Sequence, residues 1–229
     1  MDNYLTDTIV RRDGRLYSND TLIKDHNWHR LLSDYGWEKL PSKLITLLNK
    51  TLDKPKRNSL FGTLDCGSEG NCLFSCISFA MSDTNEVDGD QIRTLISDNI
   101  TLDEYNSIIH IYKVLADTDD FYEEWDPYDM DYDTFKEIIL SNNFWGDIHL
   151  LSLLTKYSQI NCKVLFSNEY TDSYYYYPLL DEYDPSHNTI ILLYENEVHF
   201  KLIGHFTDND MITLFTNETL PDEIINIRK

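Results

Sequence analysis

Through the first two thirds of the chain, apolar residues recur at the three- and four-residue spacing of amphipathic helices. This spacing predicts two short helices near the N-terminus and several more in the middle of the chain. The segment from Asn71 to Met81 is apolar on nearly every side, which predicts a helix buried all round. The other expected helices lie at 26–35, 41–53, 88–98, 102–115, 131–142, 146–158 and 221–227.

After residue 160 the apolar period shortens to that of β-strands. The continuous apolar run at 189–194 is typical of a strand buried on both faces, and the polar turn after it predicts a hairpin with the next strand. Helices first and strands later favour an α+β fold, or layers of helices around a small sheet. The other extended segments are expected at 59–65, 162–166, 173–178, 198–203 and 211–215, with a hairpin around Asp13.

The 229 residues include 19 Lys and Arg against 40 Asp and Glu, so the formal net charge is −21. Such acidity excludes general binding to nucleic acids and anionic membranes, because both present negative charge. The hydrophobic fraction of 41% is enough for a packed core, so the charge does not indicate disorder. The charge indicates a basic partner or serves only solubility.

The N-terminal residues lack the apolar stretch of a signal peptide, and the sequence has no apolar run long enough to span a bilayer. We therefore expect an intracellular, cytoplasmic protein, a monomer, with its four cysteines kept as thiols. The cysteine and histidine spacings do not match a zinc site, so we expect no metal.

The most informative chemistry lies at Cys72, in the first turn of the predicted buried helix and just after Gly70. A helix N-terminus favours a thiolate, and its unpaired N–H groups point where an oxyanion would form on an attacked carbonyl. The alternative is that Cys72 is a small core residue, as we expect for Cys76 one turn further on.

A nucleophilic cysteine needs a base, and His199 is the first candidate. It lies at the start of a predicted strand, on the face opposite Val198, Phe200 and Leu202. A histidine at a strand end beside a helix N-terminus is typical of cysteine proteases. His205, with Asp208 nearby, is the second candidate, and either histidine is alternatively a packed or exposed strand residue.

Three motifs together resemble the ovarian tumour (OTU) family of cysteine proteases. The run Gly-Asn-Cys-Leu-Phe at 70–74 is similar to the family's catalytic-cysteine motif. The run Phe-Trp-Gly-Asp at 144–147 is similar to its Trp-Gly segment, and 190–200 resembles its closing strand, turn and His-aromatic pair. The motifs follow the family's order, and the resemblance implies a papain-like fold with a small central, mostly antiparallel sheet flanked by helices.

The domain bounds follow from the resemblance and from the basic, proline-containing break at 54–58. We expect an OTU-like catalytic domain at 59–207. Residues 1–58 would then form an N-terminal helical extension. Residues 208–229 would form a C-terminal strand and helix that pack on the domain.

The resemblance implies a deubiquitinating isopeptidase that needs no cofactor. Cys72 would attack the carbonyl of the C-terminal glycine of ubiquitin or a ubiquitin-like modifier. His199 would act as the base, and the backbone N–H groups of Gly70, Asn71 and Cys72 would hold the oxyanion.

The third catalytic residue departs from the family pattern. Many members carry an Asp or Asn two residues after the histidine, where this chain has Lys201. Glu69 occupies the other position that the family uses, and we expect it to orient His199; alternatively it is only a loop carboxylate beside the helix dipole.

Other functions and the source stay open at this point. An OTU-like module that binds ubiquitin or polyubiquitin with impaired catalysis is the first alternative. An unrelated acidic interaction protein with a buried Cys72 is the second. The family's occurrence in viruses and intracellular bacteria suggests a pathogen source, and then a location in the host cytoplasm.

Overall fold

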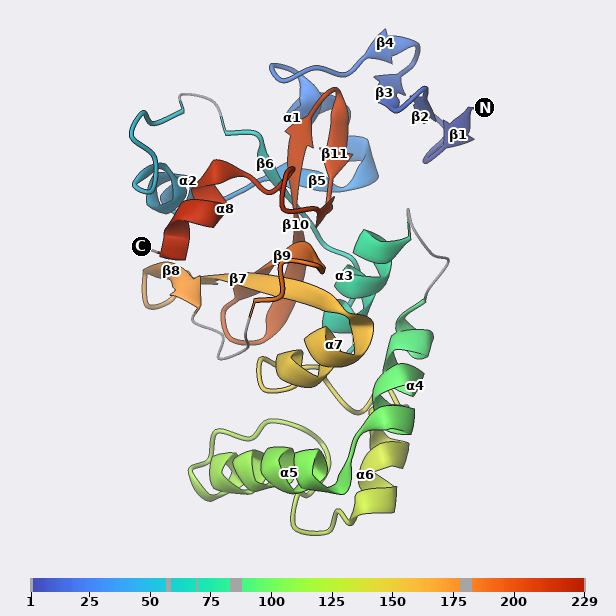
Figure 1. Cartoon of the computed structure of the whole chain (residues 1–229), viewed down its shortest axis with the longest axis vertical. Helices are drawn as coiled ribbons and strands as arrows, with labels where there is room; N and C mark the ends of the chain where they lie inside the picture. Colours follow the sequence, from blue (N-terminus) through green and yellow to red (C-terminus); the bar gives the residue numbers. More distant parts are fainter. Residues whose placement is uncertain (1, 57–58, 69, 83–87, 178–182, 229) are drawn as a thin grey trace. The chain divides into compact units, whose positions relative to one another are not determined.

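The computed structural model describes residues 2–56, 59–68, 70–82, 88–177 and 183–228 (Figure 1). The chain divides into two compact units. Unit 1 comprises Met1–Asp65, Lys163–Leu179 and Asn188–Lys229, and unit 2 comprises Cys66–Cys162 and Leu180–His187.

The main sheet has eight strands among the described residues, in the order β5-β6-β10-β9-β7-β8, with β11 beside β10 and β12 beside β9. The strands of this sheet belong to unit 1, except for the first residues of β7, which belong to unit 2. The pairings whose register is known are antiparallel. The strands are β5 Trp37–Lys39, β6 Phe61–Leu64, β7 Ile160–Asn168, β8 Ser173–Tyr177, β9 Asn188–Glu195, β10 His199–Thr207, β11 Asp210–Ile212 and β12 Leu214–Phe215.

The β9–β10 hairpin forms as the apolar pattern predicts. His199 pairs with Glu195, and Asn196 and Glu197 have left-handed φ values of 53° and 64°. A turn with two consecutive residues in this left-handed conformation has a twist that matches the right-handed twist of the flanking strands. The buried pattern of β9 comes from its apolar residues, which pack on both faces of the sheet.

A second sheet, β1-β2-β3-β4, also lies in unit 1 and contains the hairpin expected around Asp13. Its strands are β1 Asn3–Tyr4, β2 Ile9–Arg12, β3 Arg15–Ser18 and β4 Thr21–Leu22. The N–H of Leu16 donates to the carbonyl of Asn209 at 2.9 Å, and Arg11 forms an ion pair with Asp210 at 3.0 Å. These contacts join the small sheet to the β10–β11 turn.

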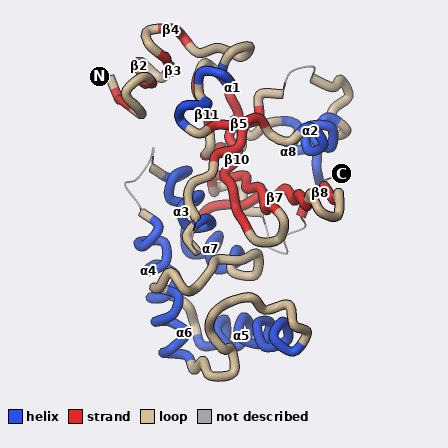
Figure 2. Tube along the Cα trace, turned by 180° about the vertical axis from the view of Figure 1, so that it is seen from behind, coloured by secondary structure: helices blue, strands red, loops and turns tan. Residues whose placement is uncertain are grey.

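The helical segments of unit 1 are α1 Trp28–Leu31, η1 Ser33–Tyr35, α2 Ser42–Asn49, α8 Asp222–Ile225 and η2 Asn226–Arg228. The helices α2 and α8 lie side by side in both views (Figure 1 and Figure 2). Their apolar faces pack with strand residues in one buried core. Its members are Leu40, Leu44, Leu48, Phe61, Leu165, Ile191, Leu193, Ile203, Phe215, Leu220 and Ile224.

Unit 2 contains α3 Cys72–Met81, α4 Gly89–Asn99, α5 Leu102–Asp117, α6 Tyr132–Ile139 and α7 Leu151–Ser158. Capping boxes explain where two of these helices begin: Asp88 with Gln91 caps α4, and Thr101 with Glu104 caps α5. Helix α3 is buried along most of its length, as its all-round apolar pattern predicts.

An aromatic cluster joins α5 and α6 of unit 2 to the acidic segment between them. Tyr112, Phe121, Trp125, Phe135 and Phe144 have neighbouring ring centroids 4.8–6.4 Å apart. The acidic residues of this segment are mainly exposed, whereas Trp125 is buried. The aromatic side chains therefore anchor the acidic connection.

The structure confirms the α+β class and the predominance of antiparallel strand pairs. One helix begins later than expected, at Leu151 instead of 146, because the Asp147 carboxylate accepts hydrogen bonds from the N–H groups of His149 and Leu150 and forms a turn there. The domain bounds stay a prediction. The main sheet itself takes β5 from the N-terminal extension and β11 and β12 from the C-terminal one.

None of the helices in the described ranges is long and apolar enough to cross a membrane.

Candidate active site

Cys72 is the first residue of α3, and its side chain is 7% exposed. Gly70 precedes it in a left-handed conformation with φ of 86°, which brings the chain into the helix. Asn71 is the N-cap residue, yet its side chain makes no capping hydrogen bond. The first N–H groups of a helix have no partner within the helix. Those of α3 therefore lack the side-chain acceptor that an N-cap residue ordinarily supplies.

Two glycines allow the close packing around this turn of unit 2. A Cβ at Gly70 would lie 2.4 Å from the carbonyl oxygen of Asn142 and 2.9 Å from Trp145. A Cβ at Gly146 would lie 2.9 Å from Phe74. The Trp-Gly segment therefore packs directly on the start of α3, and the Trp145 side chain is 51% exposed there.

Arg93 of α4 lies beneath the same turn and is completely buried. Its guanidinium donates hydrogen bonds to the carbonyl of Gly70 at 3.0 Å and to Oδ1 of Asn71 at 2.8 Å. It also stacks 3.9 Å from the Phe74 ring centre. Burial lowers the pKa of Arg93 to about 10, so the side chain stays charged at neutral pH.

Two carboxyl groups of unit 2 flank the Trp-Gly segment. Glu123 accepts hydrogen bonds from the N–H of Trp145 at 2.9 Å and from Nε1 of Trp125 at 2.9 Å. Burial nevertheless raises the pKa of Glu123 to about 7. Burial also raises the pKa of Asp147, which accepts a hydrogen bond from the Tyr112 hydroxyl at 3.2 Å.

His199 begins β10 in unit 1, and its Nε2 lies 3.2 Å from Oδ2 of Asp65. Asp65 follows β6, and the pairing of Leu64 with Leu202 brings it beside the start of β10. Phe200 and Leu202 are buried on the opposite face as expected, whereas Val198 lies in the preceding turn and is exposed. A carboxylate at this ion-pair distance stabilises the protonated form of the imidazole.

Lys201, two residues after His199, forms an ion pair with Glu195 at 2.9 Å. Glu195 is the cross-strand partner of His199. Its carboxylate is therefore the second one near the histidine, and it is paired with Lys201. His205, the second candidate base, packs its ring 4.7 Å from that of Phe61. Burial lowers the pKa of His205 to about 4.

The predicted site residues are therefore distributed over the two units. Gly70, Asn71 and Cys72 lie together in unit 2, and His199 lies in unit 1. Glu69 lies outside the described residues. Sequence reasoning missed Asp65, although a carboxylate at the end of the extended run 59–65 was the available signal.

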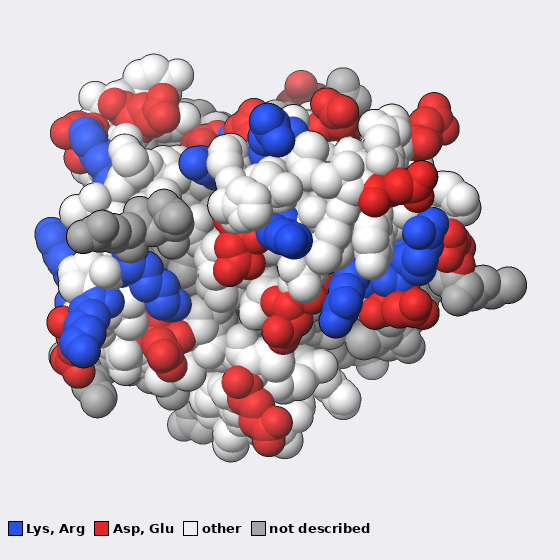
Figure 3. All heavy atoms as spheres, turned by 90° about the horizontal axis from the view of Figure 1, so that it is seen from above, with Lys and Arg blue, Asp and Glu red and all other residues white. Residues whose placement is uncertain are grey.

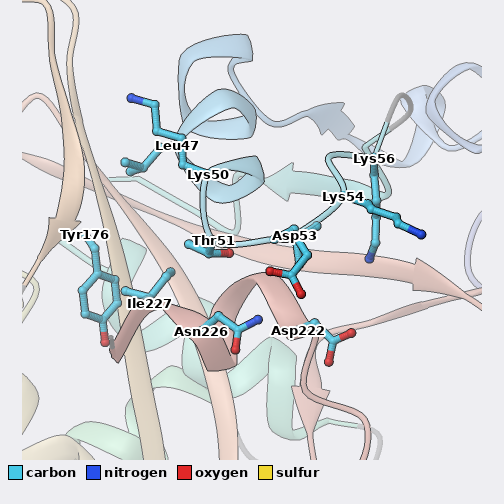
Figure 4. A pocket seen from close by; sticks show the side chains of 11 residues that line it. Leu47, Lys50, Thr51, Asp53, Lys54, Lys56, Tyr176, Asp222, Asn226 and Ile227 are labelled. Atoms are coloured by element: carbon cyan, nitrogen blue, oxygen red, sulfur yellow. The ribbon is translucent and has the colours of Figure 1, made fainter.

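A cavity of about 790 Å³ lies elsewhere in unit 1, between the end of α2 and α8 (Figure 4). Lysines and carboxylates line it together, including Lys50, Lys54, Asp53 and Asp222. Both signs also lie side by side on the face drawn in Figure 3. These mixed charges do not select a ligand.

No protein-family model matches the chain, and no curated protein matches it in sequence. The solved structures similar to it include an OTU domain in complex with ubiquitin, with a TM-score of 0.44 and 14% identity, covering 72% of this chain and 80% of that one. An OTU deubiquitinase from Wolbachia pipientis bound to ubiquitin has a TM-score of 0.43 and 14% identity, covering 66% and 98%.

The viral OTU domain protease from Dera Ghazi Khan virus is similar at a TM-score of 0.41 and 14% identity, covering 66% of this chain and 86% of that one. The family of these structures is the one that the three sequence motifs resemble.

Proposed function

We propose that the protein is a cysteine-type deubiquitinase that hydrolyses the bond between the C-terminal glycine of ubiquitin, or of a ubiquitin-like modifier, and a lysine. The observation that carries this proposal is the position of Cys72, in the first turn of a buried helix and two residues after the left-handed Gly70. The substrate class rests on the resemblance of the three motifs to the OTU family.

In the proposed reaction the Cys72 thiolate attacks the glycine carbonyl, while His199 holds the thiol proton. N–H groups around Gly70, Asn71 and Cys72 stabilise the oxyanion. His199 then protonates the leaving lysine amine, which gives a thioester on Cys72. Water, deprotonated by His199, attacks the thioester, and the modifier leaves with a free carboxylate as the thiol is restored.

Asp65 is the carboxylate that we assign to orient His199. It contacts Nε2, so proton transfer falls to Nδ1 of the ring. Glu69, the carboxylate expected from the sequence, stays a prediction for the same role. Asp65→Asn and Glu69→Gln separate the two assignments.

The test uses ubiquitin with a C-terminal electrophile. The wild-type protein should form a covalent adduct that Cys72→Ala abolishes, whereas Cys76→Ala, one turn further along the same helix and fully buried, should still form it. If the folded wild-type protein forms no adduct, the proposed enzymatic activity is refuted. Ubiquitin binding without an adduct would instead support the non-catalytic binding module.

A further inference from the structure

Arg93 is a fully buried charge that takes no part in the proposed reaction. A buried guanidinium is costly unless its donors are satisfied. Beyond Gly70 and Asn71, its donors reach the carbonyl of Ile139 at 2.7 Å and that of Phe144 at 3.1 Å. The side chain therefore joins α4 to three segments of unit 2, and one of them is the turn before Cys72.

The contact with Asn71 changes what this residue does for α3. An N-cap asparagine ordinarily accepts a hydrogen bond from the N–H groups of the first helical turn. Here Oδ1 of Asn71 accepts from Nε of Arg93 at 3.1 Å and from Nη2 at 2.8 Å. The Asn71 amide nitrogen donates to Asn142 Oδ1 at 3.1 Å. Both ends of the side chain are thus engaged away from the helix, which explains the missing cap.

The contact with Gly70 fixes the backbone before Cys72. A peptide unit is planar, so holding the Gly70 carbonyl also fixes the direction of the Asn71 N–H, which donates to the carbonyl of Ser68 at 3.3 Å. The next N–H along the chain, that of Cys72, is the first of α3. The left-handed conformation of Gly70 is thereby held by a charged hydrogen bond.

We propose that Arg93 is a positioning residue for the oxyanion donors. It keeps Asn71 from capping α3 and fixes the Gly70 turn, so that the N–H groups at the start of α3 face the attacked carbonyl. This inference rests on the proposed function, because it concerns the acyl-transfer chemistry of Cys72.

The test compares two reactions of the same thiol. Hydrolysis of ubiquitin with a fluorogenic C-terminal amide forms an oxyanion, whereas alkylation of Cys72 by iodoacetamide does not. For Arg93→Lys, which keeps the charge but loses the forked geometry, kcat should fall about 10- to 100-fold with KM nearly unchanged. The alkylation rate of Cys72, followed by mass spectrometry of its peptide, should change less than about threefold, since attack on iodoacetamide needs no oxyanion donor.

Ser97→Ala is the matched control. Ser97 is buried on the same helix and donates to the carbonyl of Lys136 at 2.9 Å, away from the turn. Its loss should leave kcat, KM and alkylation unchanged. A fall in kcat equal to that of Arg93→Lys would show that any damage to α4 has this effect, and would overturn the proposal.

Asn71→Ala provides a second variant if Arg93→Lys does not fold. An alanine cannot cap α3, but it removes the Oδ1 acceptor that ties the turn to Arg93. The looser turn should lower kcat, with KM and alkylation retained. In the double variant the two losses should combine to little more than the larger one, because both act through one turn. The role of Arg93 would be overturned if the two losses in kcat multiplied in full in the double variant. It would also be overturned if the alkylation rate fell as much as kcat, or if the variants kept the wild-type kcat. An inactive, folded wild type would instead refute the proposed function.

Discussion

Nε2 of His199 lies 3.2 Å from Oδ2 of Asp65, across the boundary between β6 and β10. The two residues are 134 positions apart in the sequence. The antiparallel register of β6 and β10 brings them together. Both belong to unit 1, so the imidazole and its carboxylate are held on one framework.

Asp65→Asn should lower kcat/KM by about 10- to 100-fold, because the carboxylate that we propose orients His199 is replaced by a neutral amide. Steady-state hydrolysis of a fluorogenic ubiquitin substrate measures the change. Glu69→Gln should have a smaller effect in the same assay.

Glu195→Gln is the matched control for local charge. Glu195 pairs with His199 across the strands, but its carboxylate contacts Lys201. This variant should retain near-wild-type kcat/KM. If Glu69→Gln causes the larger loss and Asp65→Asn has none, Asp65 does not orient the histidine.

The sequence predicts local elements of this fold well, because their determinants lie close together along the chain. The all-round apolar segment became α3, and the polar turn at 195–197 became the β9–β10 hairpin. The proposed nucleophile, Cys72, stands out for the same reason, since Gly70 lies only two residues before it.

The contacts of Asp65 and Arg93 depend on long-range packing, which periodicity does not encode. Asp65 becomes a partner of His199 only through the β6–β10 register. Arg93 is a polar residue in an amphipathic pattern, and its complete burial follows from carbonyl groups supplied by distant segments. The pairing of β5 with β6 also joins segments that are distant along the chain, whereas β11 joins β10 through a tight hairpin.

Gly70→Ala should abolish most hydrolysis. The new Cβ would lie 2.4 Å from the carbonyl oxygen of Asn142, and φ of 86° is strained for any residue with a side chain. We expect kcat/KM to fall by about 100-fold or more, as when oxyanion donors are displaced.

Gly14→Ala separates strain from displacement. Gly14 has a similar φ of 69°, but a Cβ there meets no atom within 4 Å. This variant should cost about 1 kcal/mol of stability and leave kcat/KM unchanged. Equal kinetics for the two alanine variants would mean that the Gly70 turn has no role in the reaction.

Glu123 should make unit 2 less stable as the pH rises. Its pKa is about 7 in the folded protein, above its ordinary value of 4.5, so the folded state binds the proton more tightly. The stabilising effect is complete below pH 4.5 and is lost as the pH rises through 7. The rise of the pKa from 4.5 to about 7 corresponds to a change in unfolding free energy of at most about 3 kcal/mol. Burial is the largest cause of this rise, and the hydrogen bonds from Trp145 and Trp125 oppose it.

Hydrogen exchange of unit 2 between pH 4.5 and 8, corrected for intrinsic rates, measures this effect. Glu123→Gln should flatten the pH dependence, whereas Glu124→Gln at the neighbouring exposed position should leave it as in the wild type. Identical profiles for wild type and Glu123→Gln would contradict the assignment.

His205 should have the opposite effect on unit 1. Burial lowers its pKa to about 4 from an ordinary 6.5, so the unfolded chain takes up the proton first. Stability is therefore complete above pH 6.5 and falls as the pH drops through 4, by at most about 3 kcal/mol. The carboxylates of Glu223 and Asp25 reduce this loss and the Lys56 ammonium increases it.

His205→Gln should reduce the loss of protection in unit 1 between pH 6.5 and 4, as measured by hydrogen exchange of β10 and β6. The exposed His26→Gln variant should keep the wild-type loss, because it leaves the buried His205 in place. Kinetics add an independent readout: His205→Gln should remain active, whereas His199→Ala should not. An inactive His205→Gln beside an active His199→Ala would assign the base to His205, and the ring would then have to accept a proton at neutral pH despite its burial against Phe61.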